Sequence, residues 1–208
     1  MNNNDIKIKV ILVEDDDDFA FLVKKMITAN PRLDYLGRAS GWATGVEMAQ
    51  TLNPQITLMD LNLSGSELDG IEAAKEIRLT TNSKVILLTS YEQPEIVIEA
   101  SKKSFASGYL FKSDCQNLAD TIYKTAISAT PQEQFIKELV LSELTAAERG
   151  VLNELIAANS DVLSSQFQSK PDTVSGSSPK TIANQKTSIF RKLGVRNTGE
   201  LVGVFRGW

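Results

Sequence analysis

The chain has 208 residues, a formal net charge of -4 and a hydrophobic fraction of 42%, which fits one large or two small folded domains in water. It has no histidine and one cysteine, which excludes an intramolecular disulfide, histidine metal sites and Ser-His-Asp catalysis. No apolar run is long enough to span a membrane, and the first residues, MNNNDIKIK, lack the apolar core of a signal peptide; we therefore expect a cytoplasmic protein without a membrane partner.

Five short apolar runs rich in β-branched residues predict strands. They are KIKVILV (7–13), LDYLGRA, QITLM (55–59), KVILLT (84–89) and GYLF (108–111). Helical spacing of apolar residues lies between them, as in FAFLVKKMI (19–27), IEAAKEI (71–77) and 118–127. Because parallel strands need crossover connections, this alternation predicts an α/β fold with a five-stranded parallel sheet and helices on both faces.

Polar side chains follow four of the predicted strands, where sites form in parallel sheets. Glu14 and Asp15 follow the first strand and Asp60 the third, while Thr89 ends the fourth and Lys112 follows the fifth. Clustered carboxylates favour a divalent cation between them, and Mg²⁺ is the usual choice where phosphate is handled. Each residue alone has an ordinary explanation as a turn, cap or surface residue, but together they favour a site with Asp60 as nucleophile.

Three helices are predicted after residues 129–143, which we expect to be a linker. They cover 144–158, 178–193 and 198–205. Thr145 and Glu148 form a capping-box pattern at the start of the first, and Gly194 ends the second. Residues 159–177 are expected to be an irregular connection because they are rich in Ser, Asp and Gln.

The charge is unevenly distributed along the chain. Residues 1–129 carry more acids than bases, whereas residues 178–208 carry six Lys and Arg residues and one acid, Glu200. A basic tail suggests a nucleic-acid partner. The alternative is a solvated helix face, and charge alone does not decide between them.

Residues 8–128 resemble a CheY-like receiver domain through VILVEDD, TLMDLNLSGSELDGIEAAKEIR, VILLTS and GYLFKS. The resemblance implies a flavodoxin-like receiver over residues 1–128 that is phosphorylated on Asp60 by a sensor histidine kinase. It further implies that Thr89 and Lys112 contact the phosphoryl group and that Tyr109 is the switch residue. The implied Mg²⁺ ligands are Glu14, Asp15, Asp60 and the backbone carbonyl of Asn62.

Two features of the sequence qualify this resemblance. Ser64 stands where the family usually has proline, and the loop that leads to Asp69 is two residues longer than usual.

A hydrolase of the haloacid-dehalogenase kind would also use an aspartyl nucleophile and Mg²⁺. That motif needs a second Asp two residues later, where this chain has Asn62, so we do not expect an enzyme.

Residues 144–208 resemble a LuxR/NarL-type helix-turn-helix domain, through LTAAERGVLNELIAA and SPKTIANQKTSIFRKLGVRN. The resemblance departs near 164–177, where an insertion lengthens the domain; DVLSSQF, with Leu163 and Phe167, is the expected positioning helix. We expect Ile182, Ile189 and Leu193 to face the core. The residues expected to be available to DNA are Lys180, Thr181, Asn184, Lys186, Thr187 and Arg191.

The sequence therefore predicts a phosphorylation-controlled regulator of transcription that binds promoter DNA and forms a homodimer when phosphorylated. The alternative is a regulator whose degenerate helix-turn-helix domain binds a protein partner instead of DNA. The apolar residues of the last helix fit either the core or a dimer seam: Leu201, Val202, Val204 and Phe205.

Overall fold

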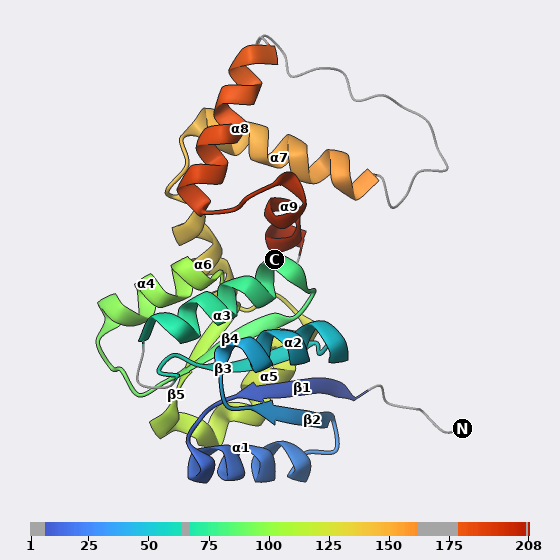
Figure 1. Cartoon of the computed structure of the whole chain (residues 1–208), viewed down its shortest axis with the longest axis vertical. Coiled ribbons are helices and arrows are strands. Elements are labelled where there is room, and N and C mark those ends of the chain that lie inside the picture. The colour runs from blue at the N-terminus through green and yellow to red at the C-terminus, as the bar shows by residue number, and fades with distance from the viewer. Residues whose placement is uncertain (1–6, 64–66, 162–178, 207) are drawn as a thin grey trace.

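The computed structural model describes residues 7–63, 67–161, 179–206 and 208, and its centre is a five-stranded sheet (Figure 1). The strand order is β2-β1-β3-β4-β5, and each neighbouring pair is parallel. The strands are β1 (Ile8–Val13), β2 (Leu33–Ala39), β3 (Ile56–Asp60), β4 (Lys84–Thr89) and β5 (Gly108–Phe111). The predicted parallel sheet is confirmed.

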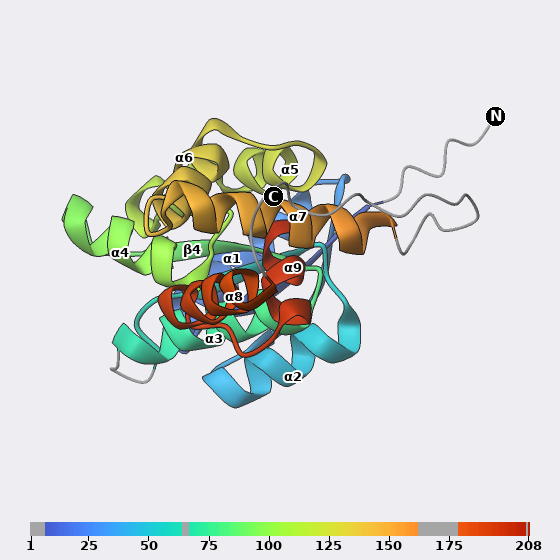
Figure 2. The ribbon, with the colours of Figure 1, turned by 90° about the horizontal axis from the view of Figure 1, so that it is seen from above.

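Helices cover both faces of the sheet, as the alternating pattern predicts: they lie above and below the strands in Figure 1, and Figure 2 views the molecule from the upper side. One face carries α2 (Trp42–Leu52), α3 (Glu67–Thr80) and α4 (Pro94–Ser104); the other carries α1 (Asp17–Ala29) and α5 (Leu118–Ile127). A short 3₁₀ helix, η1 (Lys112–Asn117), joins β5 to α5. Successive side chains of a strand point to opposite faces, so Ile11 and Val13 enter one core while Val10 and Leu12 enter the other.

The segment that we expected to be a linker, 129–143, forms a helix, α6 (Pro131–Leu141). Thr130 caps it by accepting a hydrogen bond from the amide of Glu133 at 3.1 Å. The buried Glu133 carboxylate pairs with Lys84 at 3.0 Å, and the helix packs on α4. This segment is therefore an ordered helix packed against the α/β part of the chain.

Three helices follow, α7 (Ala146–Asp161), α8 (Pro179–Leu193) and α9 (Thr198–Arg206). The predicted capping box is confirmed: the amide of Thr145 donates to Glu148 at 2.8 Å, and the amide of Glu148 donates to the Thr145 hydroxyl at 3.3 Å. Gly194 ends α8 with a φ of 62°, a conformation that favours glycine. The expected positioning helix with Leu163 and Phe167, the insertion near 164–177 and Ser178 lie outside the described residues.

The C-terminal helices share a core with the α/β part of the chain, because Phe105 at the end of α4 is buried among them. Leu152, Ile189 and Leu201 contribute to this core, and α9 packs on α3 (Figure 1). The expectation that Ile182, Ile189 and Leu193 face the core is confirmed. The four apolar residues of the last helix, Leu201, Val202, Val204 and Phe205, are all buried within this chain. In the described part of the chain, every helix is too short or too polar to cross a membrane.

The buried Glu148 predicts an acid-sensitive contribution to stability. The Lys192 amine, 2.7 Å away, and the Ser188 hydroxyl lower the pKa of Glu148 from 4.5 to about 2. Folding thus favours the ionised carboxylate, so its contribution is complete above pH 4.5 and is lost as the pH falls toward 2. We expect the Glu148→Gln substitution to lower the free energy of unfolding most at pH 7 and progressively less below pH 4.5, as measured by urea denaturation across this range. Glu154→Gln, on the exposed side of α7, is the control; an effect of Glu148→Gln that does not vary with pH would contradict this account.

Candidate functional site

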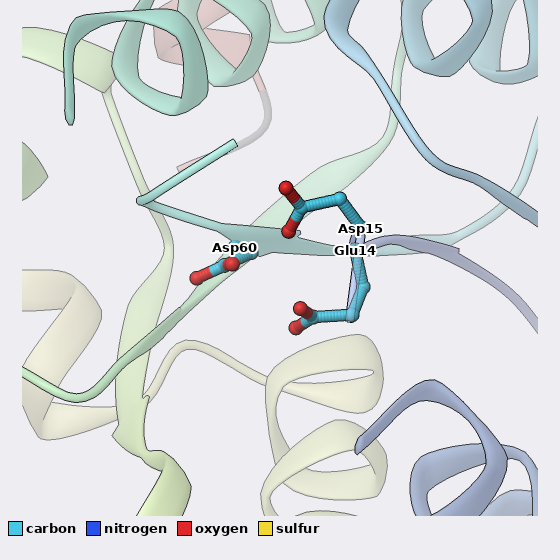
Figure 3. Close-up of side chains that lie close together, drawn as sticks. All are labelled: Glu14, Asp15 and Asp60. Carbon is cyan, nitrogen blue, oxygen red and sulfur yellow. The ribbon is translucent and has the colours of Figure 1, made fainter. Parts of the chain in front are cut away.

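Three carboxylates meet at the carboxyl edge of the sheet (Figure 3). Glu14 and Asp15 follow β1 and Asp60 ends β3; one oxygen of each lies within 4.8 Å of the others. The Asp60 residue is only 4% exposed and Glu14 is fully buried, whereas Asp15 is exposed. Buried carboxylates at this separation repel each other unless a cation lies close to them, so the arrangement favours cation binding.

Lys112 supplies one cation from the end of β5. Its amine lies 2.8 Å from a Glu14 oxygen and 3.1 Å from an Asp60 oxygen. Burial alone would lower the pKa of Lys112, but the hydrogen bond to Glu14 and the charge of Asp60 outweigh burial and raise the pKa. Burial raises the pKa of Glu14 despite the opposing hydrogen bond from Lys112. One ammonium against three carboxylates leaves the cluster negative, which suits a divalent cation with oxygen ligands.

The cluster lines a cavity of about 350 Å³. Thr89 and Asn62 line this cavity as well, so the structure brings together all the residues predicted for the phosphoryl and metal site, and Tyr109, the predicted switch residue, lies outside the cavity. The amide of Asn62 donates to Asp60 at 3.3 Å, and the Thr89 hydroxyl accepts from the amide of Tyr91 at 3.0 Å. The cavity is thus lined by the groups that a bound phosphoryl group needs: acceptors for a cation, a hydroxyl and an ammonium.

Glycine at position 70 allows α3 to approach this site closely. A Cβ atom there would lie 2.3 Å from the Asp60 carbonyl oxygen and 2.5 Å from that of Leu61, far inside contact distance. Ser64, which stands where the family that the sequence resembles usually has proline, lies outside the described residues.

Tyr109 lies apart from the Asp60 cavity. Its ring packs edge-to-face on Phe111, with 5.7 Å between the centroids. It lines a separate apolar cavity of about 140 Å³ between α4, β5 and α6, with Phe135 and Ile136 on the α6 side. The amide of Tyr109 also donates to the Gln132 side chain of α6 at 2.9 Å. The predicted switch residue is therefore in contact with the helix that leads to the C-terminal helices.

The predicted DNA-contact residues lie on α8, and four of them form one exposed stripe. Helical spacing places Lys180, Asn184, Thr187 and Arg191 on the same face, and all four are exposed. Thr181 is exposed at the edge of this stripe. Lys186 does not belong to it: its amine lies 5.6 Å from the centroid of the Phe190 ring, and the residue is half-buried. The exposed stripe therefore contains two of the three basic residues predicted to contact DNA, Lys180 and Arg191.

One residue near the acidic cluster was not expected from the sequence. Arg38 lies near the end of β2 and donates to the backbone carbonyls of Glu14 and Asp15. The signal that could have identified Arg38 is its position, because it lies at a strand end like the other site residues.

Known proteins resemble this chain in sequence and in fold. Residues 10–123 match the family described as the response regulator receiver domain. The transcriptional regulatory protein YdfI of Bacillus subtilis is 27% identical over 206 residues, with 94% of each chain covered. The transcriptional regulatory protein LiaR of the same organism is 32% identical over 138 residues, covering 66% of this chain and 64% of LiaR.

The fold also matches solved structures. The RcsB response regulator of Salmonella typhimurium superimposes with a TM-score of 0.54 at 20% identity, and the match covers 95% of this chain and 96% of RcsB. At this identity the likeness shows the fold alone, but it spans both the receiver and the C-terminal helices. Since the receiver model matches more than half of the sequence, the chain belongs to the response regulator receiver family.

Proposed function

We propose that this chain is a two-component response regulator that accepts a phosphoryl group on Asp60 from a sensor histidine kinase and regulates transcription through DNA binding by its C-terminal helices. The observation that carries the proposal is the buried Asp60 carboxylate, 3.1 Å from the Lys112 amine and within 4.8 Å of Glu14 and Asp15. The two relatives described above are both named as transcriptional regulatory proteins.

The site residues divide the chemistry of phosphoryl transfer between them. An Asp60 carboxylate oxygen attacks the phosphorus of a phosphohistidine, forming an O–P bond while the N–P bond to the imidazole breaks. The Lys112 amine and the Thr89 hydroxyl then donate to phosphoryl oxygens. Mg²⁺, when bound, supplies positive charge that offsets the developing negative charge. Its ligands in this proposal are Glu14, Asp15, Asp60 and the backbone carbonyl of Asn62, a donor set that fits a hard cation.

DNA binding is proposed for the exposed stripe on α8. Lys180 and Arg191, at the two ends of the stripe, can neutralise phosphates, while Asn184 and Thr187 between them can contact base edges. In a phosphorylated homodimer, two such stripes would meet two half-sites of a promoter. Lys186 is left out of this surface because of its position over Phe190.

The DNA contact can be tested by fluorescence anisotropy with a labelled fragment of the promoter at the chain's own locus. We expect affinity to fall steeply with salt, because phosphate contacts release counterions. Arg191→Gln should weaken binding and reduce the slope of log affinity against log salt by about 1. Lys186→Gln is the matched control and should leave that slope nearly unchanged. A chain that does not bind DNA at low salt, with or without beryllofluoride as phosphoryl mimic, would contradict the proposed output.

A further inference from the structure

Arg38 connects β2 to the turn that carries two of the three clustered carboxylates. Its Nε donates to the Glu14 carbonyl at 2.7 Å, and Nη2 donates to the Asp15 carbonyl at 2.9 Å. The third group, Nη1, pairs with the Asp17 carboxylate in the first turn of α1. The side chain is only 24% exposed, so these contacts are partly shielded from water.

These bonds fix the orientation of the turn. Two consecutive carbonyls are held by one rigid guanidinium, whose planar fork fixes the relative position of its acceptors. The backbone of the turn is also bound directly to β2, because the amide of Glu14 donates to the Ala39 carbonyl at 3.0 Å. Figure 3 shows the Glu14 and Asp15 carboxylates extending from this turn toward Asp60. The turn between β1 and α1 is thus held by β2 while its side chains extend into the site.

We propose that Arg38 is a positioning residue for the divalent cation site: it holds the Glu14–Asp15 turn so that both carboxylates converge with Asp60. This inference rests on the proposed function, since it assumes that the acidic cluster binds Mg²⁺. Arg38 itself touches neither the cation nor the phosphoryl group and acts through the backbone of the turn. Groups that orient metal ligands contribute to metal affinity, and their loss typically weakens metal binding about 10-fold to 100-fold.

The charge of Arg38 makes the proposal sharply testable, because charge and positioning have opposite effects on Mg²⁺ affinity. A positive charge beside the turn repels a cation in the site. If the charge were the only effect, removing it would therefore tighten Mg²⁺ binding. The loss of the two carbonyl bonds would instead loosen the turn and weaken Mg²⁺ binding. The sign of the change therefore separates a positioning residue from a nearby charge.

The experiment is calorimetric titration of the full chain with Mg²⁺, comparing wild type with Arg38→Met and Arg38→Lys. We expect Arg38→Met to raise the Mg²⁺ dissociation constant about 10-fold to 100-fold. Arg38→Lys keeps the charge but lacks the fork, so it should also weaken binding. Urea denaturation without Mg²⁺ monitors folding of each variant.

Asp17→Asn serves as the matched control, because it removes the Arg38 ion pair and leaves both carbonyl bonds. We expect it to change the dissociation constant less than about fivefold, since Asp17 is exposed. If Arg38→Met or Arg38→Lys, with a wild-type urea midpoint, bound Mg²⁺ as tightly as wild type or more tightly, Arg38 would not be a positioning residue. If wild type itself bound no Mg²⁺, the proposed function would fail, and this inference would fail with it.

Discussion

Replacing Arg78 by methionine should lower the free energy of unfolding by about 3 to 5 kcal/mol. Arg78 lies on α3 and is only 1% exposed. Its guanidinium donates to three carbonyls: Nε to Phe105 at 3.0 Å, Nη1 to Ser83 at 3.1 Å and Nη2 to Val204 at 2.9 Å. Methionine occupies a similar volume but leaves these three buried acceptors without a donor, and each such loss costs about 1–3 kcal/mol. Urea denaturation at pH 7 measures the effect.

The charge state of Arg78 supports this expectation. Burial lowers the pKa of Arg78 to about 10, with the charge of Glu133 acting in the opposite direction, so the guanidinium is still protonated at pH 7. The bond to Val204 links the receiver to α9, 126 residues later in the chain. Arg149→Met is the control, because Arg149 makes a looser pair with Glu138 at 3.6 Å on the surface and should change stability by less than about 1 kcal/mol. If Arg78→Met lowered the free energy of unfolding no more than Arg149→Met does, the Arg78 contacts would contribute little to stability.

The sheet and the candidate site could be predicted because their signals are local. Each core strand is a short apolar run, and the polar site residues lie directly at the strand ends, as Asp60 does at the end of β3. The capping box of Thr145 and Glu148 was predictable for the same reason, since both partners lie within one helical turn.

Arg38 was missed because β2 is an edge strand. Its residues are mostly half-buried, whereas those of β3 are all buried, so the apolar pattern of β2 is weaker and does not mark the strand end as a site position. Helix α6 forms where a linker is predicted from the sequence, and Thr130, Pro131 and Glu133 are a typical helix start. Its apolar residues pack on the receiver, and that packing makes a short segment helical.

The packing of the C-terminal helices on the receiver leaves no local trace in the sequence. Arg78 and Val204 are paired across 126 positions, and neither residue type signals the other. Lys186 shows the effect of side-chain orientation: its charge suggests DNA contact, but its place on the helix brings its amine over the Phe190 ring and off the exposed stripe. Contacts between residues far apart in the chain, and the direction in which a helical side chain points, become visible only in the folded structure.

Replacing Asp60 by asparagine should abolish phosphoryl uptake by the chain. The amide is nearly the same size as the carboxylate, so the packing around this buried side chain is preserved, but it lacks the anionic oxygen that forms the acyl phosphate. The substitution also removes one of the three clustered carboxylates. Intact-mass spectrometry after incubation with Mg²⁺ and a small phosphoryl donor such as acetyl phosphate measures the uptake directly.

This mass measurement, made on wild type, Asp60→Asn and Asp16→Asn, tests the central claim that Asp60 is the phosphoacceptor. Asp16 lines the same cavity but is exposed and caps α1, so its variant controls for the loss of a nearby acid. We predict that wild type and Asp16→Asn gain up to one phosphoryl group per chain in a Mg²⁺-dependent manner, and that Asp60→Asn gains none. Uptake by Asp60→Asn equal to that of wild type, or the absence of uptake by wild type with Mg²⁺ present, would contradict the claim.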